Sequence, residues 1–248
     1  MKRFINPKLK MKIRFYLYYL KYWYKIYRQL EVEKTVVILG MHRSGTSLTA
    51  GILHKMGVSM GRMLLGPNPS NKKGHYENKI IEELNKDILR VAGGSWDCPP
   101  KQQFINDIKH RFDAKIKRII KLEQEKIWGW KDPRTVLTIE LFIPYLSNLH
   151  FIVCRRDRDD IAKSLQLRNG SSIKKWRKLA AIYDNRINHI LLKYKHCYPF
   201  LEVNFNDFFI KPHKTINEIA NFLNITITQE QEKRLLDFID PLIVHSLK

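Results

Sequence analysis

A run of aliphatic residues that leads straight into a glycine-bounded loop constrains this chain more than any other feature. Residues 36–39 are aliphatic, as in a strand covered on both faces, and the letters GMHRSGTS follow at once. Gly40, Gly45 and Ser47 match the phosphate-binding loop G-x-x-x-x-G-K-[ST], but Thr46 stands in the lysine position. The sequence therefore predicts a phosphate cradle for a nucleotide whose β- and γ-phosphates are not the reacting part.

The residue types of this loop suit an anion. Ligands of parallel sheets bind beyond the carboxyl ends of the strands, and a helix predicted to start at Thr46 would point free N–H groups at such a ligand. Arg43 would add a fork of donors for phosphate or sulfate oxygens. The hydroxyl groups of Ser44, Thr46 and Ser47 would donate hydrogen bonds. The alternative is an ordinary strand-to-helix turn with capping residues.

From Lys34 onward, segments of strand character alternate with segments of helical spacing. This alternation indicates parallel strands joined by right-handed helical crossovers. We expect an α/β chain, with a three-layer, P-loop-like fold whose central, mainly parallel sheet is flanked by helices. The expected strands are 35–40, 128–131, 150–154 and 200–205. The expected helices are 46–56, 77–91, 104–126, 159–167, 171–195, 212–224 and 230–239, with a helical or irregular segment at 136–146.

Residues 1–33 form a separate unit in this prediction, a basic, aromatic, amphipathic helix in front of the α/β domain at 34–248. The basic side chains fall within a narrow arc of a helical wheel and the other faces are largely aromatic and aliphatic; the arc holds Lys10, Arg14, Lys21, Lys25 and Arg28. Charge interrupts the apolar run too often for a membrane span. Two interpretations remain: residues 8–30 lie on an anionic membrane surface, or the apolar side packs on the domain or a second subunit.

The charge balance of the chain is strongly basic, with 45 Lys and Arg against 24 Asp and Glu and a net charge of +21. Such a field attracts anionic lipids, phosphorylated cofactors, acidic glycans and nucleic acid. Cys98, Cys154 and Cys197 are isolated, so the sequence indicates neither a zinc site nor a disulfide framework. We expect a cytoplasmic protein with no metal, and the membrane interpretation of residues 8–30 places it peripherally on the inner face of a membrane.

A second candidate phosphate segment runs from residue 150 to residue 165. Arg156 follows an apolar strand, and Ser164 lies eight residues on, about two helical turns along the next helix. The two side chains can therefore converge on one phosphate group. The alternative is an ion pair of Arg156 with Asp159 or Asp160.

Taken together, these two segments resemble the sulfotransferases that use 3′-phosphoadenosine 5′-phosphosulfate (PAPS), whose fold is similar to that of nucleotide kinases. The first looks like their 5′-phosphosulfate loop, and the second like their 3′-phosphate motif, Arg-x-x-x-Asp-x-x-x-Ser, with Arg158 where the family often has proline. The resemblance implies PAPS as the sulfuryl donor and no metal. It also implies that the donor-binding residues are His42, Arg43, Ser44, Gly45, Thr46, Ser47, Arg156 and Ser164.

The same resemblance suggests the catalytic residues. The segment N-x-x-G-x-x-E that ends at Glu77 is similar to one in bacterial and glycan-directed sulfotransferases, so Glu77 is the leading general base and His75 the second candidate. Many cytosolic relatives supply a histidine base from a Lys-x-His segment instead. Lys131 is expected to contact the bridging or sulfuryl oxygens. Arg134 is expected to bind an acidic acceptor or to orient Glu77, unless it braces a turn with Asp132.

Three functions follow from these features. The first is transfer of a sulfuryl group from PAPS to a hydroxyl or amine of an acceptor: a glycan, a lipid or a small molecule. The second is a P-loop kinase or NTPase, for which Asp132 would have to bind magnesium. The third is a nonenzymatic polyanion-binding protein, which leaves two ordered phosphate segments unexplained. Specific nucleic-acid binding is not expected, and Trp176 and Tyr183, seven residues apart, are expected in the core rather than against adenine.

Overall fold

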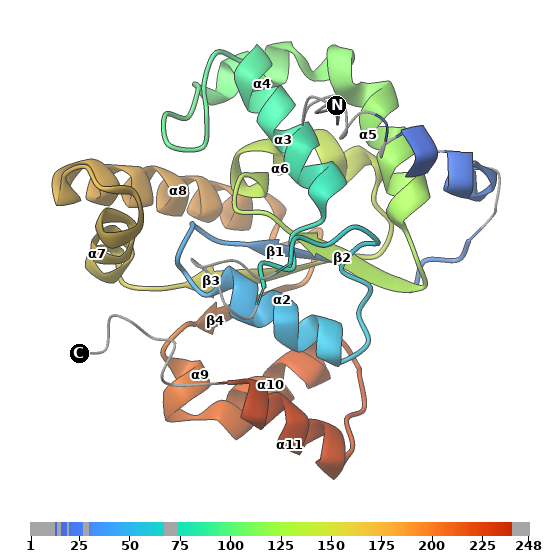
Figure 1. Ribbon diagram of the computed structural model, residues 1–248, viewed down its shortest axis with the longest axis vertical. Helices are drawn as coiled ribbons and strands as arrows, with labels where there is room; N and C mark the ends of the chain where they lie inside the picture. The colour runs from blue at the N-terminus through green and yellow to red at the C-terminus, as the bar shows by residue number, and fades with distance from the viewer. Residues whose placement is uncertain (1–12, 14–15, 19, 27–29, 67–73, 240–248) are drawn as a thin grey trace, which may run out of the picture.

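The core of the protein is a four-stranded parallel sheet, visible edge-on in the middle of Figure 1. The computed structural model describes residues 13, 16–18, 20–26, 30–66 and 74–239. Strand β1 lies between β2 and β3, and β4 is next to β3. All three strand pairs are parallel, so the carboxyl ends of the strands meet at one edge. The strands are β1 (Lys34–Leu39), β2 (Ile127–Lys131), β3 (Leu149–Arg155) and β4 (Phe200–Asn204).

Helices cover both faces of the sheet because alternate residues of β1 point to opposite sides. Val37 and Leu39 belong to one apolar cluster, and Val36 and Ile38 to the other. The first cluster, which lies above the sheet in Figure 1 apart from α7 at its left, draws on α3 (Lys79–Val91), α4 (Gln102–Asp107), α5 (Lys109–Glu123), α6 (Thr135–Phe142), α7 (Arg158–Asn169) and α8 (Ile173–Tyr194). The second draws on α2 (Thr46–Lys55), α9 (Asp207–Ile210), α10 (Pro212–Phe222) and α11 (Gln229–Phe238). The predicted three-layer α/β architecture is confirmed.

Two predicted helical regions differ in detail from the structure. The region at 104–126 consists of two helices, α4 and α5, which meet at Ile108. The region at 136–146 is helix α6 followed by the 3-10 turn η2 (Ile143–Tyr145). Pro144 lies at the start of η2, where its missing N–H and fixed φ end the regular helix.

The described part of the N-terminal segment is helical and packs one face on α5. The segment ends in the 3-10 turn η1 (Trp23–Ile26). Tyr18 is buried and donates a hydrogen bond to Glu123, and Lys25 is buried against Glu125 with its Nζ 2.6 Å from Oε1. Lys25, expected on a basic outer arc, therefore faces the domain. Lys10, Arg14 and Arg28 lie outside the described residues, and the division into units 1–33 and 34–248 stays a prediction.

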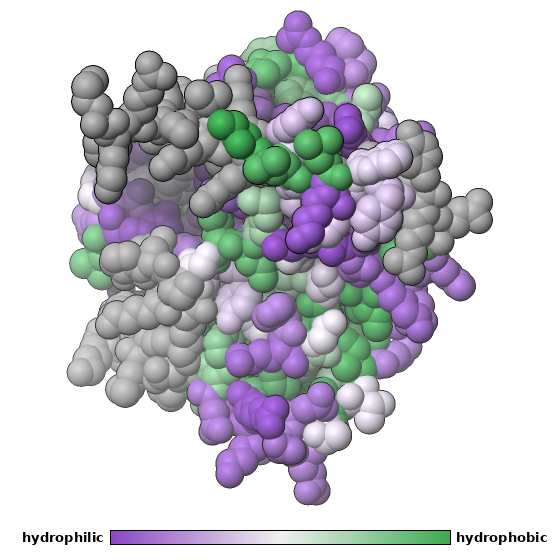
Figure 2. All heavy atoms as spheres, turned by 45° about the vertical axis from the view of Figure 1, so that its right-hand side comes forward, coloured by the Kyte–Doolittle hydropathy of each residue, from purple (hydrophilic) through white to green (hydrophobic). Residues whose placement is uncertain are grey.

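The opposite face of the same segment is apolar and exposed. Green hydrophobic atoms gather among hydrophilic ones on the side of the molecule that Figure 2 turns forward. The exposed aliphatic and aromatic side chains of the segment follow helical spacing, which places them on one face: Ile13, Tyr16, Leu17, Leu20, Trp23 and Tyr24. Within the described residues, no helix has both the length and the hydropathy of a membrane span.

A fully buried carboxyl group, that of Glu123, ties the N-terminal segment to the start of α3. One oxygen accepts the hydroxyl of Tyr18, and the other accepts Nδ2 of Asn78 at 2.7 Å. The Asn78 Oδ1 caps α3 by accepting the N–H groups of Ile80 and Ile81. Gly61, at φ 113°, leaves room for this contact, because a Cβ there would lie 2.3 Å from Asn78 Nδ2. This network fixes the residue before the cap, Glu77.

Replacing Glu123 by alanine should lower the free energy of unfolding by about 2–4 kcal/mol, because buried donors on Tyr18 and Asn78 lose their acceptor and a cavity opens. Denaturant unfolding followed by circular dichroism measures the change. Glu230→Ala on the exposed surface of α11 is the control, with a change within about 0.5 kcal/mol. Equal midpoints for the two variants would contradict the structural role of Glu123.

Candidate active site

The loop between β1 and α2 has the backbone of an anion cradle. Arg43 and Gly45 are both left-handed, at φ 71° and 93°, a conformation that turns successive N–H groups toward one side. A Cβ at Gly40 would lie 2.7 Å from Ser44 Oγ, and one at Gly45 would lie 2.5 Å from the ring of Phe205. Both glycines are therefore required by close packing. Gly45 is also the N-cap of α2 and offers no side chain to the first N–H groups of the helix, which are left for a ligand.

The structure brings the two predicted phosphate segments together. Arg43 Nε donates to Ser164 Oγ at 2.8 Å, and Arg156 Nη1 donates to the carbonyl oxygen of Arg43 at 2.9 Å. The Arg156 guanidinium also lies 4.4 Å from the ring centre of Phe205. Burial lowers the pKa of both arginines. Arg156 and Ser164 thus both contact Arg43, and their binding of one phosphate group stays a prediction.

The ion pair that was the alternative for Arg156 is weak. Its Nε lies 4.0 Å from Asp160 Oδ2, at the limit of an ion pair. Asp159 pairs with Arg177 on α8 instead. The guanidinium of Arg156 is therefore directed chiefly at the loop rather than at its own helix.

A lysine reaches the loop from the neighbouring strand. Lys131, the last residue of β2, pairs in register with Ile38 of β1, two residues before the loop. Its Nζ lies 3.0 Å from Ser47 Oγ and 2.6 Å from Glu77 Oε1. Lys131 is 1% exposed and Glu77 is 7% exposed. The ammonium that is missing at Thr46 is thus supplied to the loop from β2, beside the predicted general base.

Lys131 sets the charge state of Glu77. Burial alone would raise the pKa of this carboxyl group, but the charge of Lys131 and its hydrogen bond outweigh burial, and the net pKa is lowered. Glu77 is therefore an anion throughout the neutral range. A carboxylate in this state accepts protons and does not donate them, which is the state that a general base requires.

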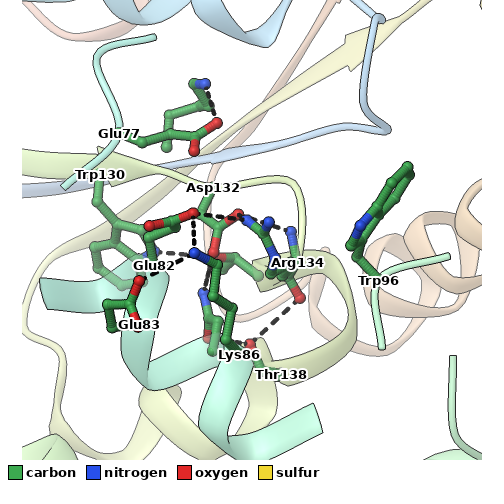
Figure 3. Close-up of polar contacts among 12 residues, drawn as sticks. Glu77, Glu82, Glu83, Lys86, Trp96, Trp130, Asp132, Arg134 and Thr138 are labelled. Carbon is green, nitrogen blue, oxygen red and sulfur yellow. Dashed lines mark hydrogen bonds and ion pairs between the residues drawn. The ribbon is translucent and has the colours of Figure 1, made fainter. Parts of the chain in front are cut away.

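Arg134 belongs to a buried ion-pair network rather than to an open surface (Figure 3). Its Nη1 lies 2.8 Å from Asp132 Oδ1 and 3.7 Å from Glu82 Oε1. The other oxygen of Asp132 accepts Asn85 Nδ2 at 2.8 Å, and Lys86 of α3 pairs with Glu82. Asp132 and Arg134 therefore brace the turn after β2. With both of its oxygens hydrogen-bonded inside the protein, Asp132 is a poor magnesium ligand, which weighs against the kinase hypothesis.

Two histidines of the predicted site each have a buried ring nitrogen. Nε2 of His42 and Nε2 of His75 are buried with no hydrogen-bond partner among the described residues. Burial lowers the pKa of both side chains, and the surrounding cations Lys131 and Arg43 lower it further, so both rings are neutral at pH 7. Each ring can therefore give or accept one hydrogen bond from a ligand. The predicted segment 68–73 before His75 lies outside the described residues.

Some residues of the site have no signal in the sequence. Phe205 packs on Gly45 and Arg156, and the ring of Trp96 lies 4.4 Å from that of His42. Trp96 belongs to a loop after α3 that matches no motif. Trp176 and Tyr183 are buried as expected.

A glycine-bounded anion loop at the carboxyl end of a parallel sheet, with clustered cations and no triphosphate lysine, defines a P-loop-like α/β protein. The model of the Sulfotransferase family matches residues 35–229, which is most of the chain, and the chain belongs to this family. It is therefore an enzyme of sulfuryl transfer.

Solved structures share the fold. Sulfotransferase STF9 from Mycobacterium avium is similar with a TM-score of 0.55 and 16% identity, over 90% of this chain and 71% of that one. Sulfotransferase STF1 from Mycobacterium tuberculosis H37Rv is similar with a TM-score of 0.52 and 13% identity, over 94% of this chain and 78% of that one. No curated protein matches the sequence.

Replacing Lys131 by methionine should raise the pKa of Glu77 above that of an ordinary glutamate, because burial is then no longer outweighed. In the wild-type protein the lowered pKa makes Glu77 stabilising above pH 4.5, an effect lost as the pH falls through the folded-state pKa. In the variant the pKa of Glu77 in the folded state lies above that in the unfolded state, so the ionised carboxylate destabilises the fold. The carboxyl group therefore takes up a proton at a higher pH than in the wild-type protein. Carboxyl ¹³C NMR titration measures both values.

Glu140 serves as an internal reference in this titration. Although burial opposes it, hydrogen bonds from Lys193 and Arg186 lower the pKa of Glu140 to about 2, and this value should be the same in both proteins. An unchanged pKa of Glu77 in the variant would show that the Lys131 ion pair does not control the carboxyl group.

Proposed function

We propose that this enzyme transfers the sulfuryl group of PAPS to a hydroxyl or amine of a glycan or glycolipid acceptor by in-line displacement. The observation that carries the proposal is the contact of Lys131 with both Ser47 and Glu77. It places a cation and an ionised base at the mouth of the anion loop, which is what proton removal and charge stabilisation at a transferring group require.

The residues present fit the proposed donor. His42, Arg43, Ser44, Gly45, Thr46 and Ser47 would hold its 5′-phosphosulfate, since the loop turns its N–H groups inward and His42 Nε2 has no partner of its own among the described residues. Arg156 and Ser164 would hold its 3′-phosphate. When bound, PAPS supplies an activated sulfuryl group on a phosphate leaving group.

Side chains of the protein would remove the proton of the acceptor and stabilise the negative charge. Glu77 Oε1 would take the proton of the acceptor, because its lowered pKa keeps it ionised. The Lys131 ammonium, donating to Glu77 and Ser47, would stabilise negative charge on the oxygens held at the loop. His75, neutral and with Nε2 buried, is the second candidate for the base. The basic surroundings of Glu77 favour an acidic acceptor.

Glu77→Gln should leave the affinity for 3′-phosphoadenosine 5′-phosphate (PAP), the product nucleotide, within twofold and lower kcat by roughly 10²–10⁴-fold, since only proton removal is lost. Calorimetric titration with PAP and transfer from radiolabelled PAPS to a panel of glycans and glycolipids measure the two effects. His75→Gln is the matched variant. Should it, and not Glu77→Gln, abolish turnover, the base is His75.

Arg43→Ala and Arg156→Ala should each weaken PAP binding by roughly tenfold or more, because each removes charge-assisted hydrogen bonds to a phosphate. Arg234→Ala on α11, which removes an exposed arginine paired with Glu230, is the control and should change nothing. If the wild-type protein does not bind PAP at millimolar concentration, the donor assignment fails.

We also propose that the N-terminal segment holds the enzyme on an anionic membrane surface, at the cytoplasmic side. Support comes from its two unlike faces: one contacts Glu123 of α5 through Tyr18 and Glu125 through Lys25, while the other exposes a stripe of aromatic and aliphatic side chains. Rings of this kind favour the membrane interface. Residues 1–30 contain no Asp or Glu, and their basic charge is complementary to anionic headgroups.

Leu20→Glu should lower binding to vesicles of phosphatidylcholine mixed with phosphatidylglycerol by roughly fivefold or more, since a charge then enters the apolar boundary. Leu192→Glu on α8, which changes a leucine even more exposed than Leu20 and outside this face, should bind like the wild-type protein. Co-sedimentation measures the bound fraction. Equal binding of both variants, or equal wild-type binding to vesicles of phosphatidylcholine alone, would contradict an anionic membrane as the partner.

A further inference from the structure

Arg168, a residue that no motif singles out, lies beside the proposed active site. It follows Ser164 by four residues on α7 and so shares its face of the helix. Ser164 Oγ accepts from Arg43 of the loop. The Arg168 guanidinium carbon lies 5.6 Å from the ring centre of Trp96, whose ring is in turn 4.4 Å from that of His42. The guanidinium therefore stands next to the loop, one helical turn beyond the proposed phosphate site.

The Trp96 ring that contacts this guanidinium is held in place by neighbouring residues. Its ring stacks on that of Trp176, with centres 5.9 Å apart and planes within 6° of parallel. Its backbone oxygen accepts the hydroxyl of Tyr183 at 2.9 Å. Figure 3 shows Trp96 on one side of Arg134, with Glu77 on the other. A guanidinium held over a fixed ring keeps its orientation, so less freedom is lost when it binds a ligand.

The other cations of the site already form ion pairs or hydrogen bonds within the protein. Lys131 is paired with Glu77, and Arg134 with Asp132 and Glu82. Arg156 donates to the carbonyl oxygen of Arg43, and the Arg43 side chain donates to Ser164. Arg168 is exposed and forms no ion pair with an acidic side chain of the described residues; its Nε donates to the side-chain amide of Asn169 at 2.5 Å.

The charge of Arg168 acts on ionisable groups at the place where the reaction is proposed to occur. It lowers the pKa of both His42 and His75, and the charge of Glu77 acts on Arg168 in return. These through-space effects agree with the cation–π contact to Trp96, which places the guanidinium near the loop. A group bound by Arg168 would consequently lie close to the base.

We propose that Arg168 selects acceptors that carry a carboxylate or sulfate group near the reacting hydroxyl, with Trp96 as the residue that positions it. The inference rests on the proposed function, because it assumes that the acceptor binds beside Glu77. The planar fork of a guanidinium matches both anions and binds them through two parallel hydrogen bonds. The acceptor would then be an acidic saccharide rather than a neutral one.

The test compares three small probes on PAP-saturated protein: methyl glucuronide, methyl glucoside and methyl glucoside 6-sulfate. The wild-type protein should bind at least one of the two anionic probes roughly tenfold more tightly than the neutral one. Arg168→Gln should abolish that preference and leave PAP affinity within twofold. Lys163→Gln, which removes an exposed positive charge from the same helix, should keep the preference. Ligand-detected NMR titration measures the sugars and calorimetry measures PAP.

Two further variants separate recognition from structure. Arg168→Lys keeps the charge without the fork and should retain only part of the preference. Trp96→Phe keeps a smaller ring and should weaken the anionic probe while the neutral probe is unaffected. The relative affinity of the two anionic probes tells whether the carboxylate or the sulfate is the favoured group.

Other outcomes overturn the inference. No preference for either anionic probe in the wild-type protein, or a preference that survives Arg168→Gln, means that Arg168 does not select the acceptor. A tenfold loss of PAP affinity in Arg168→Gln would assign Arg168 to the donor site instead. Failure of the wild-type protein to bind PAP would be a failure of the proposed function, and it is seen before any sugar is added.

Discussion

The ion pair between Lys131 and Glu77 is the interaction on which the site depends. Both side chains are almost sealed from water, and either charge alone would be costly in that position. Together, with Ser47 as a third partner, they join the end of β2, the approach to α3 and the anion loop. The pair also decides chemistry, because it keeps Glu77 ionised against the effect of burial. One contact thus joins the proposed base to a nearby positive charge.

The sheet topology makes this contact possible. Strand β1 has β2 on one side and β3 on the other, all parallel. The residues that follow each strand therefore meet at one edge: the loop after β1, Lys131 at the end of β2 and Arg156 just after β3. Glu77 is added by the connection between β1 and β2, where Glu123 and Asn78 set the start of α3. The same buried carboxyl group holds Tyr18, so the N-terminal segment and the site share one support.

Sequence spacing was a good guide wherever a residue acts from a regular element next to a strand end. Contacts of Arg43 join the loop at 40–47 to Arg156 and Ser164, and the shared phosphate group stays a prediction. Where two partners competed, spacing left the choice open. Asp132 and Arg134 form the buried brace that was one of the two possibilities, and Arg156 turns toward the loop rather than fully toward Asp160.

The sequence by itself determined the α/β class, the glycine-bounded loop and the order of the two predicted phosphate segments, because these follow from local periodicity and from glycine spacing along one stretch of chain. Only the tertiary structure decided which cation replaces the loop lysine, since Lys131 is 84 residues from its Ser47 partner. It alone also placed Arg168 on Trp96. Such contacts depend on how helices and loops pack across the sheet, and no local pattern encodes them. Thr46 in place of a lysine is accordingly no loss of charge, because a neighbouring strand supplies it.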